Sequence, residues 1–301
     1  MPLPYRWQWR IERWKTALRG FFGGGEKPAA RPRLCPACGT LVGTTAKRCH
    51  ECGTSLTFSL TAAGKSVGEL LGGEAPVTRV FLVINILMFV VSFLATARAA
   101  GGLSLFGGIS GPVLFRMGAN VPGELFNGEW WRLVTGMFLH GGLIHIGFNM
   151  MVLLDIGPNV EQVYGSPRYL FLYVATGMVA SAASSLVGHF SVGASGALMG
   201  LVGLMIAITT RRGGAAMKML RGRLLMWAGS IIVIGLLGFF AMDNAAHIGG
   251  LAAGFLLGRV FADREPIPGS ELKRAYALGW LAGLVVVASF VLMLLSYCRP
   301  A

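Results

Sequence analysis

Long apolar runs alternate with short polar segments along most of this chain. From about residue 78 onward, seven runs approach the roughly 20 residues that a helix needs to cross a bilayer. They predict membrane-spanning helices over residues 80–97, 133–156, 169–187, 194–210, 224–242, 245–262 and 277–297. The stretch between the first two, residues 99–130, is too polar to span and too apolar for a simple exposed loop. We expect it to be a loop half-immersed in the interface.

Composition supports a membrane protein. Of 301 residues, 54% are hydrophobic and only 13% are charged, with a mean hydropathy of +0.64, which is more apolar surface than a soluble domain of this size could bury. The pattern therefore predicts an all-α polytopic membrane protein with one membrane domain and a small appendage. A formal net charge of +13 fits basic cytoplasmic loops and disfavours nucleic acid as a partner.

Basic residues also predict the orientation in the membrane. Residues 211–223 (RRGGAAMKMLRGR) carry five Lys/Arg and no acid, and the segment before the first run is basic as well. Both face the cytoplasm only if the N-terminus is inside and seven helices cross. The C-terminus is then outside, and we see no secretory signal at the N-terminus.

The first 30 residues combine an amphipathic segment with a flexible break. Trp7, Ile11 and Trp14 recur at helical spacing, with arginines mostly off that face. Such a basic, Trp-rich helix suits an anionic membrane surface, and packing on its own domain is the alternative.

Four of the five cysteines lie close together, in a module over residues 31–58 that a linker over 59–76 follows. Their spacing is C-x2-C-x10-C-x2-C, and the residues are Cys35, Cys38, Cys49 and Cys52. Four thiolates suit tetrahedral Zn²⁺, and the predicted cytoplasmic location argues against two disulfides. We therefore predict a small zinc-ribbon-like domain with a structural zinc, in which His50 is an alternative ligand.

Polar residues inside the predicted spans indicate function, because they are costly in lipid. Ser195, His247, His145 and Asn149 all fall in the outer half of the bilayer, on three helices that run in the same direction. Ser195 lies in GASG, where small neighbours leave its hydroxyl open to a reacting carbonyl. A small-residue helix contact is the plainer interpretation of that string alone.

The other polar residues complete a possible hydrolytic site. His247 lies beside a ridge of glycines spaced by four, which would let a neighbouring helix approach closely. His145 and Asn149 share one helix face and could donate hydrogen bonds to an oxyanion. His140 is off that face, so we assign it a structural role, and capping of the sixth helix is the favoured role of Asp243. The residues predict a Ser–His dyad.

Together these motifs resemble the rhomboid family of intramembrane serine proteases, over roughly residues 78–262. They are, in order, Trp131-Arg132, the H-x4-H-x3-N pattern of His140, His145 and Asn149, the pattern Gly157, Glu161 and Gly165, the GxSG of Ser195, and AHIGGLAAG with His247. The resemblance implies a six-helix catalytic core over residues 77–265, and an additional transmembrane helix over 266–301.

The resemblance also implies roles and partners. Ser195 would be the nucleophile, His247 the base, and His145 with Asn149 and the Ser195 N–H the oxyanion hole, while Trp131, Arg132 and Glu161 would be structural. The substrates would be transmembrane proteins cut in or near their spanning helix, without a catalytic metal. Met199 departs from the family pattern, since bacterial members often have an aromatic residue there. We expect a bacterial inner-membrane protein that contacts the lipid bilayer, with a cytoplasmic protein as a possible partner of the zinc module.

Two other functions fit part of the pattern. One is a catalytically inactive rhomboid-like protein that binds membrane clients, which the presence of both Ser195 and His247 disfavours. The other is a transporter with a histidine relay, which would need intramembrane acids near the midplane, and the sequence has none well placed.

Overall fold

The computed structural model describes residues 32–56, 59–71, 74–100, 102, 108–238 and 242–298. The chain forms two compact units, Met1–Thr57 and Phe58–Ala301, and each is described by itself. The predicted amphipathic segment around Trp7 and Trp14 lies outside the described residues, and it stays a prediction.

The first unit is built around a short hairpin. Strand β1 (Arg33–Leu34) pairs antiparallel with β2 (Leu41–Val42), with Arg33 opposite Val42 and Leu34 opposite Leu41. A small core lies beneath it, which includes the buried Ala37 and Val42 and two of the four clustered cysteines. Such a core is too small to hold a fold without a crosslink or a metal.

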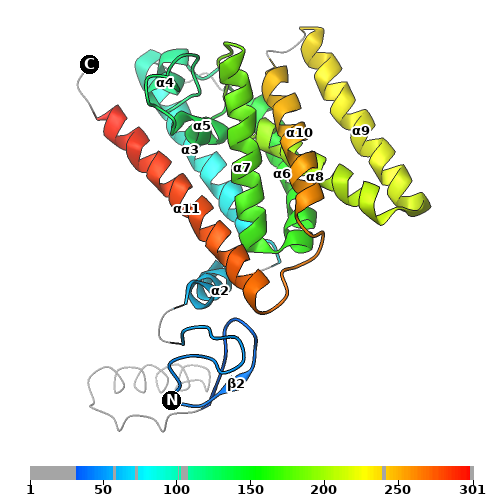
Figure 1. Cartoon of the computed structure of the whole chain (residues 1–301). Helices are drawn as coiled ribbons and strands as arrows, with labels where there is room; N and C mark the ends of the chain where they lie inside the picture. The colour runs from blue at the N-terminus through cyan, green and yellow to red at the C-terminus, as the bar shows by residue number, and fades with distance from the viewer. Residues whose placement is uncertain are drawn as a thin grey trace, which may run out of the picture. The chain divides into compact units, whose positions relative to one another are not determined.

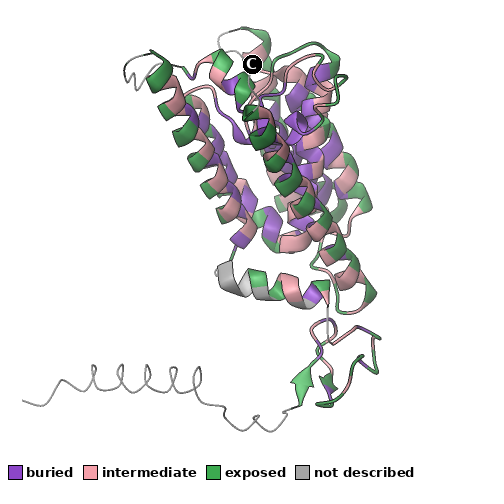
Figure 2. Cartoon of the chain, turned by 90° about the vertical axis from the view of Figure 1, so that its left-hand side faces the viewer, coloured by how far each residue is buried: buried purple, intermediate pink, exposed green. Residues whose placement is uncertain are grey.

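The second unit is a helical bundle (Figure 1). Its long helices are α3 (Pro76–Ala100), α6 (Leu143–Tyr164), α7 (Ser166–Leu186), α8 (Ser195–Arg212), α9 (Gly214–Leu236), α10 (Asn244–Val260) and α11 (Ser270–Tyr297). Shorter helices are α2 (Leu60–Leu71), α4 (Gly111–Arg116), α5 (Arg132–Thr135) and the 3-10 helix η1 (Gly136–Phe138). Buried residues line the inner faces of the long helices and exposed ones point outward (Figure 2).

These seven long helices correspond to the seven predicted spans, which confirms the all-α polytopic fold class. Five of them, α3, α6, α7, α9 and α11, are long and apolar enough to cross a membrane by length and composition. The other two, α8 and α10, have 18 and 17 residues. These two helices pack on each other within the bundle.

Glycines allow α8 and α10 to approach closely, as the ridge in the sequence predicted. A Cβ on Gly254 would overlap the carbonyl of Gly200, and one on Gly250 would overlap the carbonyl of Gly196. A Cβ on Gly203 would in turn overlap the backbone of α10. Backbone therefore packs on backbone along the contact, and this fixes the helix that begins with Ser195 against the helix that carries His247.

We expect Gly254→Ala to destabilise the bundle, because its methyl group has no room beside Gly200. Overpacking of this kind costs about 1–3 kcal/mol. The matched control is Gly222→Ala on α9, where a Cβ meets nothing within 4 Å. Thermal unfolding in detergent should show a lowered Tm for Gly254→Ala and an unchanged or slightly raised Tm for Gly222→Ala. Equal Tm values for the two variants would contradict the close packing.

Several predicted boundaries were wrong. The second span starts at Leu143 rather than at 133, because the Gly141-Gly142 pair interrupts the apolar run and the preceding residues form α5 and η1. The basic segment 211–223 is a loop only near Gly213, since its Lys and Arg are good helix formers and α9 begins at Gly214. Residues 59–76 are not a simple linker.

The helix in that last segment, α2, packs against α11. The indole N–H of Trp280 donates to the carbonyl of Leu60 over 2.9 Å, and Gly64 lies against the ring of Tyr276. These contacts make α2 part of the membrane unit, although its sequence contains residues typical of linkers.

The stretch predicted as a half-immersed loop also has its own structure. Within the described part, α4 and the residues after it form a small core with Ile109, Leu114, Met117, Ala119 and Leu139. Part of the segment thus packs on protein, whereas Phe115, Phe126 and Trp130 remain exposed.

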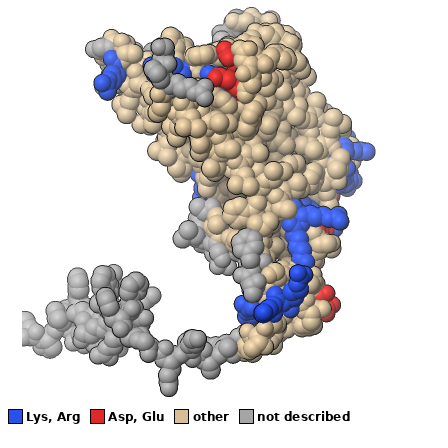
Figure 3. All heavy atoms as spheres, turned by 60° about the vertical axis from the view of Figure 1, so that its left-hand side comes forward, with Lys and Arg blue, Asp and Glu red and all other residues tan. Residues whose placement is uncertain are grey.

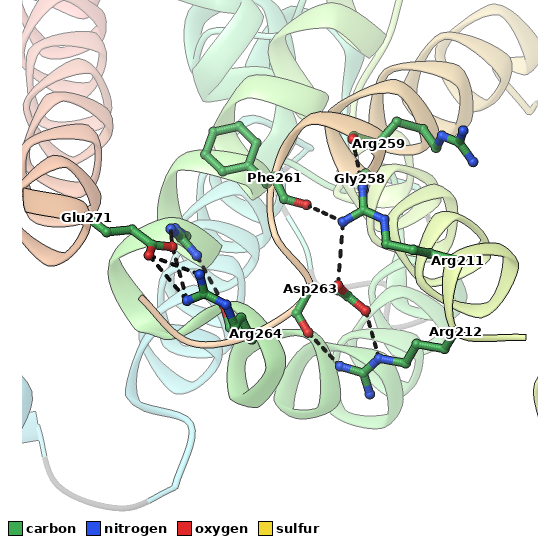
Figure 4. A network of polar contacts seen from close by, with 9 residues as sticks. Arg211, Arg212, Gly258, Arg259, Phe261, Asp263, Arg264 and Glu271 are labelled. Atoms are coloured by element: carbon green, nitrogen blue, oxygen red, sulfur yellow. Dashed lines mark hydrogen bonds and ion pairs between the residues drawn. The ribbon is translucent and has the colours of Figure 1, made fainter. Parts of the chain in front are cut away.

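An arginine network ties the helices together at the end of the bundle where α8 and α10 finish (Figure 4). Arg211 donates to the carbonyls of Gly258, Arg259 and Phe261 over 2.9, 2.7 and 3.0 Å. These are groups that the end of α10 leaves without helical partners. Arg212 binds Asp263 over 2.7 Å, and this hydrogen bond lowers the pKa of the Asp263 carboxyl.

Candidate active site and metal centre

Ser195 and His247 meet at the other end of α8 and α10. Ser195 is the first residue of α8, and His247 lies in the first turn of α10. The two side chains are 52 residues apart in sequence, and the Oγ of Ser195 is 3.0 Å from the Nε2 of His247. This is hydrogen-bond distance between a hydroxyl and an imidazole, the arrangement that activates a serine.

The helix start supports the same chemistry. The first backbone N–H groups of a helix have no helical partner, so the N–H of Ser195 is free to bind an oxygen, and the helix dipole favours negative charge there. Gly193, two residues earlier, has φ of 120°, a conformation that favours glycine. The N–H of Gly193 donates to the carbonyl of Gly136 over 2.9 Å, which fixes the turn before the serine.

His145 and Asn149 face this turn from α6. A Cβ placed on Gly193 would lie 2.7 Å from the Nε2 of His145 and 3.5 Å from the Nδ2 of Asn149. Asn149 is buried, and its Nδ2 has no hydrogen-bond partner among the described residues. Both side chains thus face the turn before Ser195 from one side of α6, and their role as oxyanion donors stays a prediction.

Asp243 caps α10 rather than contacting the imidazole. Its carboxylate accepts from the N–H of Ala246 over 3.0 Å. This confirms the capping role that the sequence favoured. The Nδ1 of His247 is buried and has no partner within the described part of the chain.

Comparisons with known proteins identify the fold that carries this site. The family model of the rhomboid domain matches residues 127–264, which contain all four of these side chains. The putative rhomboid protease YdcA of Bacillus subtilis is 33% identical over 142 residues, which cover 44% of this chain and 67% of that protein. The chain belongs to the rhomboid family.

Two longer relatives are also similar. The rhomboid protease GluP of Bacillus subtilis is 34% identical over 189 residues, 61% of this chain and 34% of that protein. RHOMBOID-like protein 5 of Arabidopsis thaliana is 40% identical over 166 residues, 51% of each. The match therefore spans between a third and a half of these two relatives. The bundle is accordingly a rhomboid-like six-helix core, α3 and α6–α10, with α11 as the seventh helix.

His140 does not lie on a membrane-spanning helix of this rhomboid core, contrary to our expectation. It precedes α6, so the helical-face argument that separated it from His145 does not apply. Its ring is fully buried and meets the ring of His145 edge-on, with centroids 5.1 Å apart. His140 therefore packs behind His145.

Arg132 is buried between two aromatic rings. Its guanidinium carbon is 4.5 Å from the ring centroid of Phe115 and 4.6 Å from that of Trp131. It also donates to the carbonyls of Phe115 and Ala119 over 2.7 and 3.1 Å, and it pairs with Glu129. The Trp131-Arg132 pair thus holds α4 against the start of α5.

Glu161 joins the starts of α3 and α7. Its carboxylate accepts from the N–H groups of Val77 and Thr78 over 3.0 and 2.9 Å. It also accepts from the hydroxyls of Thr78 and Ser166 over 2.8 and 2.7 Å. The buried carboxylate thus caps the start of α3 and binds the first side chain of α7, far along α6 from Asn149.

Sequence reasoning missed Asn120, which holds the turn before Ser195. Its backbone pairs with Ser191 through two hydrogen bonds of 3.1 and 2.9 Å. Its side chain donates to the carbonyl of Ser181 and accepts from the hydroxyl of Ser185, each over 2.8 Å. Asn120 lies in the stretch that we expected to be interfacial, and a lone asparagine there carries no signal of burial.

Met199 is buried on the α8 face that meets α9 and α10. It packs with Val202, Ile206 and Ala228, and the partly buried Leu251 and Phe255 lie against the same cluster. The sulfur thus fills a hydrophobic layer one turn beyond Ser195. Its effect on the orientation of His247 stays a prediction.

The four clustered cysteines have the geometry of a metal centre. The sulfurs of Cys35, Cys38, Cys49 and Cys52 all lie within 4.8 Å of one another. Cys35 and Cys52 are 3.6 Å apart at sulfur, as are Cys38 and Cys49. Four sulfurs about 2.3 Å from one Zn²⁺ would be separated by about 3.8 Å, so the cluster fits that ion closely.

Each cysteine pair forms the same turn. The N–H of Gly39 donates to the carbonyl of Cys35, and the N–H of Gly53 to that of Cys49, both over 2.9 Å. Gly39 and Gly53 have positive φ, 77° and 65°. The repeat explains why both pairs are followed by glycine, because a Cβ is disfavoured in that conformation.

The thiols of Cys35 and Cys52 differ electrostatically. Burial raises the pKa of the Cys35 thiol to about 11. Burial also acts to raise the pKa of Cys52, but hydrogen bonds to the side chain and backbone of Thr54 outweigh it and lower that pKa to about 6. Of these two thiols, Cys52 therefore forms a thiolate more readily than Cys35.

Proposed function

We propose that this protein is an intramembrane serine endopeptidase that cuts transmembrane proteins in or near their membrane-spanning helix. The hydrogen-bond distance of 3.0 Å between Ser195 Oγ and His247 Nε2 is the observation that carries the proposal. Similarity to proteins named as rhomboid proteases supports the same activity.

In the proposed reaction, Nε2 of His247 accepts the Ser195 proton while Oγ forms a bond to the scissile carbonyl carbon. The C–N bond then breaks, and Nε2 passes the proton to the leaving amine. A water molecule that loses a proton to the same nitrogen releases the acyl group from Ser195. The imidazole needs its own proton on Nδ1 throughout the first step.

The developing oxyanion requires donors, and three converge beside Ser195. They are the Ser195 N–H at the start of α8, Nε2 of His145 and Nδ2 of Asn149. The unpartnered Nδ2 of Asn149 is a donor already desolvated for this purpose, which strengthens its hydrogen bond to a charged oxygen.

A serine-directed fluorophosphonate tests the proposal, because it bonds only to an activated serine. The full chain in detergent should be labelled, Ser195→Ala should not be, and His247→Ala should react far more slowly. The alternative is a catalytically inactive rhomboid relative that holds membrane clients. It predicts an unlabelled wild type that still retains an uncut transmembrane protein.

We further propose that the N-terminus is cytoplasmic and the protein resides in a bacterial inner membrane. The basic start of α9 and the arginines at the ends of α8 and α10 lie at one end of the bundle, as the orientation rule requires for a cytoplasmic face. A reporter that is active only outside the cytoplasm should then be active when it is fused to the C-terminus, and a reporter that is active only in the cytoplasm should not. A cytoplasmic signal there would contradict a seven-helix count with the N-terminus inside.

For the first unit we propose a structural zinc site made by Cys35, Cys38, Cys49 and Cys52. Four protein ligands occupy all the coordination positions of a tetrahedral zinc ion, so no position remains for a reacting water. In this scheme the Ser–His chemistry proceeds without a metal. Contact with a cytoplasmic protein through this module stays a prediction.

A further inference from the structure

A basic cavity lies at the end of the bundle where α3 and α11 finish. Its volume is about 430 Å³, and it is lined by Ala95, Arg98, Ala99, Val113, Arg116 and Tyr297. The lining comes from the last turns of α3, from α4 and from the end of α11, the helices at the upper left in Figure 1. Ser195 and His247 do not line it.

Among the residues that the structure describes, no acid compensates the charge of this cavity. Arg98 and Arg116 both line it, and no carboxylate does. Among the described residues, neither arginine forms an ion pair with an acid. Arg116 lies over the ring of Tyr297, with its guanidinium carbon 4.8 Å from the ring centroid, and donates to the carbonyl of that residue over 3.5 Å. These contacts orient the guanidinium without neutralising it.

The position of the cavity matches the boundary between lipid and water. On the face that Figure 3 shows, a broad band without charged side chains covers the middle of the bundle, and charged side chains of both signs appear toward its ends. Arg98 is in the last turn of α3, which is the most apolar of the candidate spans, with a mean hydropathy of 2.6. A tyrosine beside the arginines is typical of the headgroup level.

Apolar surface continues from the cavity along both helices. Ala95 and Ala99 lie on the same face of α3 as Arg98, one turn apart, and leave room beside the guanidinium. Farther along, α3 exposes a series of aliphatic side chains, namely Val83, Ile86, Leu87, Val90, Val91 and Leu94. The stretch of α11 that leads to Tyr297 exposes Val287, Val291, Leu294 and Leu295.

A ligand for this surface needs an anionic head and apolar chains. A free phosphate would satisfy the two arginines but would leave the aliphatic surface unused, whereas a phospholipid matches both. We propose that the cavity binds the phosphate of an anionic phospholipid between Arg98 and Arg116, with its acyl chains along α3 and α11. The site is independent of the proposed protease activity.

The test compares lipid retention by the full chain. Protein purified from mixed micelles with phosphatidylglycerol or phosphatidylcholine is analysed by native mass spectrometry. Two guanidiniums near a headgroup should make Arg98→Gln with Arg116→Gln lose about 10-fold in phosphatidylglycerol affinity. The control pair Arg223→Gln with Arg259→Gln, two exposed arginines that do not line the cavity, should lose less affinity for phosphatidylglycerol than the cavity pair.

Folding and the source of the phosphate are checked separately. If the double variant has a lowered Tm, Arg98→Gln alone is used, because its guanidinium has no described partner to lose. Equal retention of phosphatidylglycerol by wild type and the folded variant would overturn the proposal. The proposal would also be overturned if inorganic phosphate in lipid-free detergent raised the Tm of the wild type as much as phosphatidylglycerol does. That result would indicate a site for a free anion.

Discussion

Alanine at either Ser195 or His247 is expected to abolish cleavage of a transmembrane substrate, with kcat lowered by at least about 10⁴-fold. The reason is that the hydroxyl is not nucleophilic without the imidazole 3.0 Å away, and the imidazole has nothing to deprotonate without the hydroxyl. The double variant should be no slower than either single variant, because the two residues act as a unit.

The donors beside the serine should contribute less than the dyad. Asn149→Ala removes one of three donors to the oxyanion, so we expect a loss of about 10²–10³-fold or less. The measurement is gel-based cleavage in liposomes, with the Tm of each variant determined to exclude unfolding.

Ser230→Ala is the matched control for these variants. Ser230 is an exposed serine on α9 that donates to the carbonyl of Met226, and its alanine variant should cleave at the wild-type rate. Wild-type cleavage by Ser195→Ala would disprove the protease assignment and favour the client-binding alternative.

Replacement of Cys35 and Cys38 by serine should unfold the first unit and release its zinc. The free energy of zinc binding is about 10–16 kcal/mol in small zinc domains, and here it would be most of the stability of a unit with so small a core. Elemental analysis should find one zinc per chain in the wild type and none in the variant.

The membrane unit should remain folded in that variant, because the boundary between the units lies at Thr57–Phe58, and α2 packs on α11 within the second unit. Cys298→Ser is the matched control, since Cys298 is exposed and lies outside the cluster. The site would be ruled out if carefully purified wild-type protein contained no zinc. It would also be ruled out if the Cys298→Ser control lost its zinc.

Much of the fold was predictable because lipid imposes strong rules on sequence. A bilayer requires apolar runs of set length, so seven helices were visible from the pattern, including the glycine-rich α8 and α10. The first and last residues of the helices were less predictable, because apolar residues are also buried in segments that are not helical. Residues 133–140 are buried and mostly apolar, yet Gly141 and Gly142 separate them from α6.

The sequence by itself determined the local patterns: a serine between glycines, a histidine beside a glycine ridge, two polar residues four positions apart and four paired cysteines. Only the tertiary structure decided that Ser195 Oγ and His247 Nε2 lie 3.0 Å apart. That distance depends on backbone contact between α8 and α10 at Gly196, Gly200 and Gly254, and on Asn120 fixing the preceding turn. Such contacts join residues far apart in the chain, and periodicity reports only which face of a helix is buried, not which neighbour covers it.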